Sequence, residues 1–199
     1  MNGFLAMVIA YFVGGIPFGY VLVRLTTGKD VRSTGSGNIG ATNVLRTTGR
    51  AAGVATLLLD VAKGYFAVWL AAKWTNDDPL WTSLAALSVM AGHAFPVFLK
   101  FQGGKAVASF IGAFLYLTPL PLLAVLILFV VAVAVTKTIS AGSILAAGTF
   151  PLGVWIIQHP PAPVWIASLI AGAFIVYRHK ANIERLRAGT ENRFRWSKR

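Results

Sequence analysis

Apolar runs long enough to cross a bilayer constrain this chain more than any other feature, because a membrane helix needs roughly 20 mostly apolar residues. Pro119 and Pro121 interrupt a longer apolar stretch at 106–136 and disfavour helix just before them, so we divide it into 106–118 and 121–136. Hydrophobic residues make up 56% of the chain and charged residues 12%, about half the charged share of soluble domains. The sequence therefore predicts an all-α integral membrane protein, a compact bundle of seven transmembrane helices, at 4–25, 51–72, 82–99, 106–118, 121–136, 139–157 and 163–178.

The distribution of charge supports seven spans, with the N-terminus outside and the C-terminus in the cytoplasm. This topology places sixteen of the 18 lysines and arginines in cytoplasmic segments, leaving Lys63 inside a span and Lys73 on the outer side. A single span over 106–136 would put the basic tail outside, against the positive-inside tendency. The N-terminus lacks a basic region and a small-residue cleavage site, so it is interpreted as a first span rather than a signal peptide. The net charge of +12 predicts anionic partners, either lipid headgroups or phosphate substrates, and no nucleic acid.

The first polar segment, "VRSTGSGNIGATNVLRTTGR" (31–50), contains a G-x-G-x-x-G pattern formed by Gly35, Gly37 and Gly40. A dinucleotide site would need a preceding β-strand, whereas a predicted membrane helix precedes this segment and another follows it. Asp60, twenty residues after Gly40, falls at bilayer depth and not at a ribose. Glycines that let backbone N–H groups approach, neutral side-chain donors and the Arg46 guanidinium instead favour a phosphate site. A flexible basic loop lying on lipid headgroups is the alternative.

The second polar segment, "GHAFPVFLKFQGGKAVAS" (92–109), places Lys105 after two glycines at the start of a predicted helix. This pattern again favours phosphate binding, and the alternative is an interfacial lysine that only anchors the helix end. His93 is expected to be a buried structural histidine. Asp60 and Lys63, at i and i+3, are expected to neutralise each other, with the alternative that Lys63 reaches the site.

The third polar segment, "YRHKANIERLRAGTENRF" (177–194), continues the last predicted span into the cytoplasm. His179 and Asn182 fall on one helical face, and Asn182 and Arg185 on an overlapping one. Gly189 is expected to end the helix and present Thr190 and Glu191. The alternative, a basic amphipathic tail on anionic lipid, accounts for 193–199 but not for the histidine, the asparagine and the turn.

All three segments are predicted to lie on the same membrane face, within a single domain of residues 1–199. They contain no carboxylate pair, no nucleophile arrangement and no metal-ligand cluster, and the chain has no cysteine. Such a site is suited to binding anions. Two other classes remain open from the residues alone: a transporter of phosphate or organic anions, and a lipid-binding scaffold. A transporter predicts binding groups near the midplane and paired broken helices, which the sequence does not suggest.

The segments 35–46, 92–109 and 177–194 resemble the three cytoplasmic motifs of the bacterial acyl-phosphate-dependent glycerol-3-phosphate acyltransferases, and the resemblance covers nearly the whole chain. It implies transfer of a fatty acyl group from acyl-phosphate to the 1-hydroxyl of glycerol 3-phosphate, giving lysophosphatidic acid and inorganic phosphate. It implies no metal or other cofactor. The family commonly has glycine and threonine where this chain has Ala106 and Ser109, which puts in doubt how closely the backbone approaches a ligand at Ala106.

The resemblance also implies a setting: the bacterial cytoplasmic (inner) membrane, among membrane lipids, with the active site on the cytoplasmic side and the chain acting as a monomer. A soluble enzyme that makes acyl-phosphate would be able to dock on the basic face.

The resemblance implies a role for each residue of this chain that matches a family motif. The group that accepts the proton of the attacking hydroxyl is either His179 or a phosphate of the substrate, and the phosphate is favoured. Lys63 and His93 are candidates for support of the site. The expected phosphate-binding residues are Ser36, Gly37, Asn38, Asn43, Arg46, Gly103, Gly104, Arg185 and Thr190. The expected catalytic residues are Lys105, His179, Asn182 and Glu191.

Overall fold

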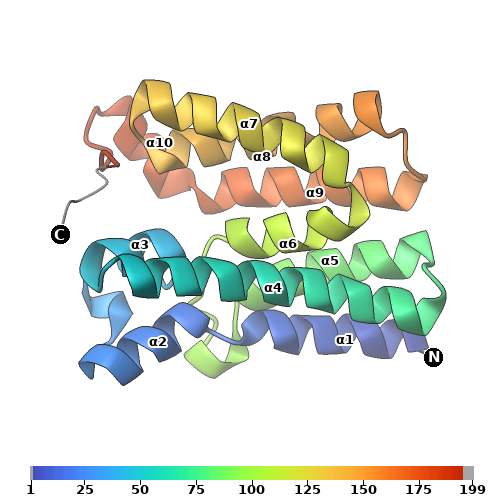
Figure 1. Ribbon diagram of the computed structural model, residues 1–199, viewed down its shortest axis with the longest axis horizontal. Coiled ribbons are helices and arrows are strands. Elements are labelled where there is room, and N and C mark those ends of the chain that lie inside the picture. Colours follow the sequence, from blue (N-terminus) through green and yellow to red (C-terminus); the bar gives the residue numbers. More distant parts are fainter. Residues whose placement is uncertain (1, 195–199) are drawn as a thin grey trace. The chain divides into compact units, whose positions relative to one another are not determined.

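The chain folds into helices that form two compact units, seen in a computed structural model that describes residues 2–194 (Figure 1). Unit 1 extends to Leu117 and unit 2 begins at Thr118. The helices of unit 1 are α1 (Asn2–Gly15), α2 (Phe18–Thr27), the 3-10 turn η1 (Val31–Ser33), α3 (Ala41–Thr47), α4 (Arg50–Thr75), α5 (Pro79–Ala94), the 3-10 turn η2 (Val97–Leu99) and α6 (Val107–Leu117). Those of unit 2 are α7 (Pro119–Thr136), α8 (Ile139–Ile157), α9 (Ala162–Arg178) and α10 (Lys180–Arg187).

Glycines hold the helices of unit 1 together at close range. A Cβ on Gly14 of α1 would overlap the carbonyl oxygen of Val89 in α5, and one on Gly92 of α5 would overlap that of Tyr11. Small residues at such crossings let backbones approach, as is usual between helices in membranes. α4 packs against α6 in the same way and serves as the central helix of the unit.

Unit 2 is a layer of three long helices in which α8 packs against both α7 and α9. Its core is formed by apolar side chains that are almost fully buried, among them Phe150, Val154 and Ile175. Gly172 of α9 brings its backbone against the carbonyl of Ala147 in α8. α10 follows α9 after a bend and carries the third polar segment.

The structure confirms an all-helical membrane protein, and the helix ends match the predicted spans to within about three residues at nearly every end. Within residues 2–194, five helices or helix pairs are long and apolar enough to cross a membrane, and the bent pair α9–α10 raises this to six. α6 has 11 residues, which at 1.5 Å per residue covers about half of a ~30 Å hydrocarbon core. The count of seven complete crossings and the orientation of the termini stay predictions.

The first predicted span is not one helix, contrary to the sequence-based expectation for 4–25. α1 ends at Gly15 and α2 begins at Phe18, so the break falls at Ile16 and Pro17. Pro17 has no N–H to donate and disfavours helix at the residue before it. The sequence "GGIP" at 14–17 therefore already indicated a break in the helix at this point.

Candidate active site

Two glycines of the first motif adopt backbone angles that other residues avoid. Gly35 has φ +58° and Gly37 has φ +71°, both in the left-handed region. Gly40 is extended and leads into α3, whose seven residues separate the loop from the membrane helix α4. The predicted membrane helix after segment 31–50 is confirmed as α4, and α3 is a short helix within the segment that the sequence did not indicate.

Asn43 shapes this loop from the inside. Its side chain is 2% exposed, and its Oδ1 accepts a hydrogen bond of 2.9 Å from the N–H of Ser36. Its Nδ2 donates to the carbonyl oxygens of Thr34 and Asn38, at 3.1 Å and 2.8 Å. Because the amide is engaged at both ends, Asn43 holds the loop in shape, and any contact of its own with a phosphate stays a prediction.

The backbone donors of the first motif are also used within the loop. The N–H of Gly37 bonds to the carbonyl of Thr34, and the N–H of Gly40 bonds to Oδ1 of Asn38 at 2.8 Å. The expected cradle of free N–H groups is therefore not seen at Ser36, Gly37 or Gly40. The exposed side chains of the first motif include the hydroxyl of Ser36 and the guanidinium of Arg46.

The two glycines of the second motif are required for packing. The N–H groups of Gly103 and Gly104 donate to the carbonyl oxygens of Ala94 and His93, at 3.2 Å and 3.0 Å. A Cβ on Gly104 would overlap the imidazole of His93. Lys105 follows, half-buried, two residues before the start of α6. The predicted position of this lysine at a helix entrance is confirmed.

Apolar side chains from the first two motifs share one core in unit 1. Val31, Ile39 and Val44 lie in or beside the first loop, and Leu99 belongs to the second motif. All four are buried and pack in one cluster with Val23 of α2. This core fixes the two motifs of unit 1 to each other.

Lys63 and His93, expected to support the site, are both buried in unit 1. The predicted pairing of Lys63 with Asp60 is confirmed, with 2.8 Å between Nζ and Oδ1. Nζ also donates to the carbonyl of Ile16 at 2.8 Å. His93 is 4% exposed, as expected for a structural histidine.

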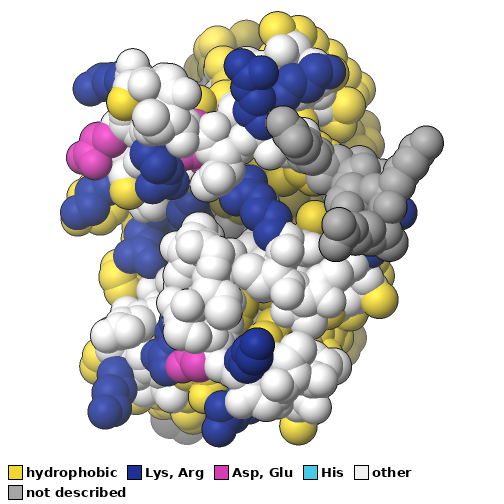
Figure 2. All heavy atoms as spheres, turned by 90° about the vertical axis from the view of Figure 1, so that its left-hand side faces the viewer, with side chains coloured by type: hydrophobic (Ala, Val, Ile, Leu, Met, Phe, Trp, Pro, Cys, Tyr) yellow, Lys and Arg dark blue, Asp and Glu magenta, His cyan; other side chains and the backbone are white. Residues whose placement is uncertain are grey.

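Basic side chains dominate the end of unit 1 that carries α2, α3 and the two motifs. Figure 2 looks onto this end and shows lysine and arginine side chains there with few acidic ones. The one carboxylate beside the first motif, Asp30, is paired with Arg32 at 2.7 Å. Hydrogen bonds from this guanidinium hold the pKa of Asp30 below its usual value. The remaining cations give this end a positive field that attracts anions.

In the third motif, α10 ends as the sequence predicts. Gly189 has φ +69° and its N–H bonds to the carbonyl of Leu186, while the N–H of Thr190 bonds to that of Arg185 at 2.9 Å. These two bonds form a Schellman motif, the usual glycine-dependent end of a helix. The turn folds Glu191 back over α10.

Glu191 lies at the centre of a hydrogen-bond cluster in unit 2. Its Oε1 accepts from Nδ2 of Asn182 at 2.8 Å and from Oγ of Ser140 at 3.0 Å, and its Oε2 accepts from Nε of Arg185 at 2.7 Å. Burial alone raises the pKa of this carboxyl, but the three hydrogen bonds outweigh it and hold the pKa below its usual value. The structure thus joins three residues expected from the sequence and adds Ser140 of α8, which no sequence signal marked.

His179 does not lie on a continuous helical face, contrary to the prediction. The chain bends by 56° between α9 and α10, and His179 is the residue at the bend. Its ring is 3% exposed, and Nδ1 lies 2.8 Å from the carbonyl oxygen of Ile175. That hydrogen bond assigns the neutral ring the tautomer with hydrogen on Nδ1, in which Nε2 carries the lone pair.

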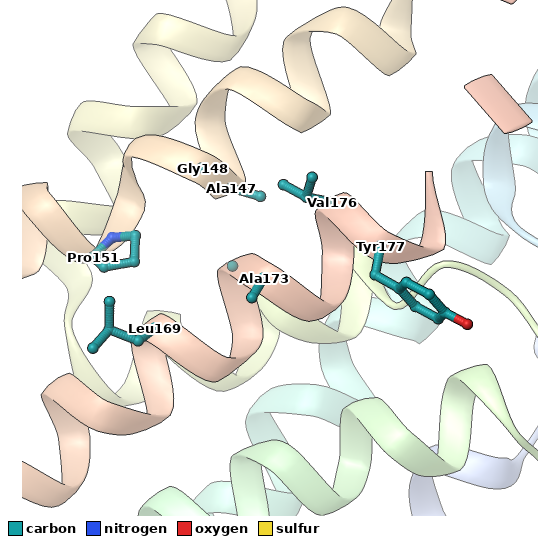
Figure 3. A pocket seen from close by; sticks show the side chains of 8 residues that line it. Ala147, Gly148, Pro151, Leu169, Ala173, Val176 and Tyr177 are labelled. Atoms are coloured by element: carbon teal, nitrogen blue, oxygen red, sulfur yellow. The ribbon is translucent and has the colours of Figure 1, made fainter. Parts of the chain in front are cut away.

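An apolar groove of about 480 Å³ runs between α8 and α9 in unit 2 (Figure 3). Small side chains, including Ala147 and Ala173, leave this space open, and Pro151 and Leu169 lie along it. Tyr177, two residues before His179, lines one end. The groove has the chemistry of a site for a hydrocarbon chain.

No three histidine, cysteine, aspartate or glutamate side chains within residues 2–194 come together as a metal site requires. Groups able to hold an anion are present in each unit: Ser36, Arg46 and Lys105 in unit 1, and Arg185 and Thr190 in unit 2. Each set combines cationic and hydroxyl donors, which suit phosphate oxygens.

The chain is similar over nearly its whole length to bacterial acyltransferases. It is 47% identical to the glycerol-3-phosphate acyltransferase of Geobacter sulfurreducens over 98% of this chain and 99% of the relative. It is 39% identical to that of Fusobacterium nucleatum over 98% of this chain and 100% of the relative.

Solved structures agree with these relatives. The crystal structure of PlsY (YgiH), an integral membrane glycerol 3-phosphate acyltransferase, in its glycerol 3-phosphate form matches with a TM-score of 0.93 and 34% identity. That match covers 98% of this chain and 96% of PlsY. The form of PlsY with lysophosphatidic acid matches with a TM-score of 0.90. The family model described as glycerol-3-phosphate acyltransferase matches residues 4–189, and the chain belongs to this family of membrane acyltransferases.

Proposed function

We propose that this acyltransferase moves a fatty acyl group from acyl-phosphate to the 1-hydroxyl of sn-glycerol 3-phosphate, releasing lysophosphatidic acid and inorganic phosphate. Both substrates of this reaction carry a phosphate, and one carries a long apolar chain. The observation that carries the proposal is the first motif, in which Asn43 braces two left-handed glycines so that Ser36 and Arg46 face outward. Such a braced loop holds its anion-binding side chains in place before the ligand arrives.

In this reaction the 1-hydroxyl oxygen attacks the acyl carbonyl carbon, and the bond from that carbon to the phosphate oxygen breaks. Lys105 and Arg46 act with the hydroxyl of Ser36 on phosphate oxygens. Asn182, Arg185 and Thr190 orient glycerol 3-phosphate and the acyl carbonyl. Glu191 acts by holding Asn182 and Arg185, a role that its three hydrogen bonds support. Positioning and charge stabilisation then supply most of the rate.

The proton of the attacking hydroxyl goes to a phosphate oxygen in the version that we favour. The Nδ1–H tautomer of His179 also supports the other version, because it leaves a basic nitrogen at Nε2. The variant His179→Asn separates them, since its amide can still donate to the carbonyl of Ile175 but has no basic nitrogen. If His179 is the base, kcat falls by at least about a hundredfold. If phosphate is the base, most of the turnover remains and only KM rises.

The apolar groove between α8 and α9 is proposed to hold part of the acyl chain, since it is apolar and Tyr177 at its end is two residues from His179. We place the reaction on the cytoplasmic side of the bacterial inner membrane, with the chain acting as a monomer and as one domain. The excess of basic residues in the predicted cytoplasmic segments supports that side. It also suits docking of a soluble enzyme that makes acyl-phosphate.

The test offers purified protein glycerol 3-phosphate with one donor at a time: long-chain acyl-phosphate, acyl-CoA or acyl carrier protein. Lysophosphatidic acid and released phosphate are measured. We expect product from acyl-phosphate alone, and loss of product in Lys105→Ala. Product from acyl-CoA would show that the donor is wrongly assigned. Folded protein that binds phosphate but makes no product with any donor would favour an anion transporter instead.

A further inference from the structure

Three titratable side chains form a buried cluster in unit 1 that the proposed chemistry does not use. Asp60, Lys63 and His93 are 2%, 5% and 4% exposed. Nζ of Lys63 lies 2.8 Å from Oδ1 of Asp60, and Nδ1 of His93 lies 3.6 Å from the same oxygen. Burying charged groups costs several kcal/mol each, and well-packed apolar residues are often as stable as a buried ion pair. Stability alone therefore gives a weak reason for this cluster.

On one side, the cluster holds the break between α1 and α2. The ammonium of Lys63 donates to the carbonyl oxygen of Ile16 and lies 5.6 Å from the centre of the Phe18 ring. A carbonyl that leaves a helix inside a membrane segment needs a partner within the protein. Lys63 supplies that partner together with the N–H of Phe18, which lies 3.2 Å from the same oxygen, and so supports the start of α2, which leads into the first motif.

On another side, the cluster holds the beginning of the second motif. The imidazole of His93 packs so closely on Gly104 that a Cβ there would overlap it. The backbone of Gly103 and Gly104 is hydrogen-bonded along Ala94 and His93. A shift of the His93 ring therefore moves the residue that immediately precedes Lys105.

The same turn of α4 also contacts the end of the second motif. Gly64, next to Lys63, packs its backbone on Ser109, where a Cβ would overlap the Ser109 carbonyl. Gly112 of α6 contacts the carbonyl of Val61 in the same way. The helical turn of α4 at 60–64 thus contacts the second motif near its beginning, at His93, and at its end, at Ser109. Lys105 lies in the segment between these two contacts.

We propose that Asp60, Lys63 and His93 are positioning residues that set the place of the Lys105 ammonium, an inference that rests on the proposed role of Lys105 in binding substrate phosphate. They act through the 103–106 backbone and touch no substrate. Because a displacement of about 1 Å can cost up to a hundredfold in rate, a small shift of this segment is enough to matter.

The first experiment separates positioning from stability. Lys63→Met takes the ammonium away from the buried carboxylate of Asp60 and leaves His93 as its neighbour, whereas Asp60→Asn combined with Lys63→Met removes both the carboxylate and the ammonium. We expect kcat/KM for glycerol 3-phosphate to fall tenfold to a hundredfold in both variants, while the melting temperature falls in the single variant and recovers in the double one. Lys73→Met, on an exposed part of the same helix, is the control and should leave both quantities unchanged. Recovery of kcat/KM together with stability in the double variant would overturn the proposal.

The second experiment is a double-mutant cycle with Lys105. The quantity followed is the affinity for inorganic phosphate, since turnover is expected to be lost without Lys105. If Lys63 acts through Lys105, Lys63→Met weakens phosphate binding by less than about twofold in a Lys105→Met background. Independent losses that multiply in the combined variant would show that Lys63 acts elsewhere.

Inorganic phosphate binding, followed by its effect on the melting temperature, provides a measurement that does not need turnover. We expect Lys63→Met to weaken phosphate binding by roughly the factor by which kcat/KM falls. Wild-type protein that makes no lysophosphatidic acid would contradict the proposed function. Equal phosphate affinity in wild type and Lys63→Met would contradict the positioning role, whatever the activity.

Discussion

At the scale of single residues, most polar groups of the motifs make hydrogen bonds within the motifs and so stabilise the shape of the loops. The side chain of Asn43 makes hydrogen bonds to the backbone on either side of the first loop. Gly104 has no side chain, and this absence lets the imidazole of His93 pack against its backbone. Few groups are left to face a ligand, and those are long and cationic or carry a hydroxyl. A motif of this kind recognises phosphate through side chains on a stiff backbone rather than through a ring of free N–H groups.

Ala106 is the residue at which this shape is strained. It is fully buried and has φ +60°, in the left-handed region that costs a residue with a Cβ roughly 1–2 kcal/mol. Ala106→Gly should therefore leave the free energy of unfolding within about 1 kcal/mol of wild type, because relief of the strained angle offsets both the greater freedom of glycine in the unfolded chain and the loss of a buried methyl group. Thermal unfolding in detergent measures the change. Ala113→Gly, in the middle of α6, is the control and should destabilise, because glycine is unfavourable inside a helix.

At the scale of elements, short contacts between a turn and a helix decide where functional groups lie. The Schellman end of α10 brings Glu191 back onto Asn182 and Arg185, and α8 adds Ser140 to the same carboxylate. Glu191 thus connects the turn to two helices of unit 2. Its role is to hold its neighbours, and its ionisation state controls that role.

The stability contributed by Glu191 should depend on pH. Its pKa in the folded protein lies below the unfolded value of about 4.3, so the contribution is complete above that value and is lost as pH falls through the folded pKa. Glu191→Gln is expected to be less stable than wild type by roughly 1–3 kcal/mol at pH 7. The difference should narrow below about pH 4.5.

Melting temperatures of both proteins between about pH 3 and pH 7 test this expectation. Glu184→Gln, on the exposed side of α10, is the matched control and should behave as wild type. A difference between Glu191→Gln and wild type that stays constant over this range would contradict the assigned hydrogen bonds.

The groove between α8 and α9 gives a second prediction at this scale. Gly148 lines the groove and a Cβ added there meets no atom within 4 Å, so Gly148→Leu places its side chain toward the open space of the groove. If the groove holds the acyl chain, kcat/KM should fall threefold to tenfold for a 16-carbon acyl-phosphate and little for an 8-carbon one. The loss is moderate because each displaced methylene is worth at most ~0.8 kcal/mol and lipid solvates it. Leu145→Phe adds bulk at an exposed position that does not line the groove and should change neither value.

At the scale of the whole molecule, we predict that the chain crosses the membrane seven times. α6 covers about half of the hydrocarbon core, and the count of crossings decides the side on which the basic tail lies. Seven crossings put residue 188 on the same side as residue 102, and six put it on the opposite side.

Because the natural chain contains no cysteine, single cysteines report on this topology without further changes. An impermeant maleimide applied to intact cells should label Leu80→Cys and Ala162→Cys. It should label Gln102→Cys and Ala188→Cys only after the membrane is opened. Labelling of Ala188→Cys in intact cells would show six crossings.

Features that depend on near neighbours in the chain could be predicted from the amino-acid sequence. Apolar runs of about 20 residues marked the helices, Gly189 marked the end of α10, and the spacing of Asp60 and Lys63 placed them on one face. Each of these depends on the period of a helix or on the backbone angle of one residue, which a local pattern specifies.

Hydrogen bonds between groups that are far apart in the chain could not be predicted in this way and are seen only in the folded protein. Lys63 donates a hydrogen bond to the carbonyl of Ile16, 47 positions away, and Ser140 donates one to Glu191, 51 positions away. The bend at His179 likewise interrupts a pattern that was regular in the sequence. A buried polar group makes a hydrogen bond with a partner that lies within about 3 Å in the folded protein. Which group lies there depends on how whole helices pack against one another and not on the neighbouring residues in the sequence.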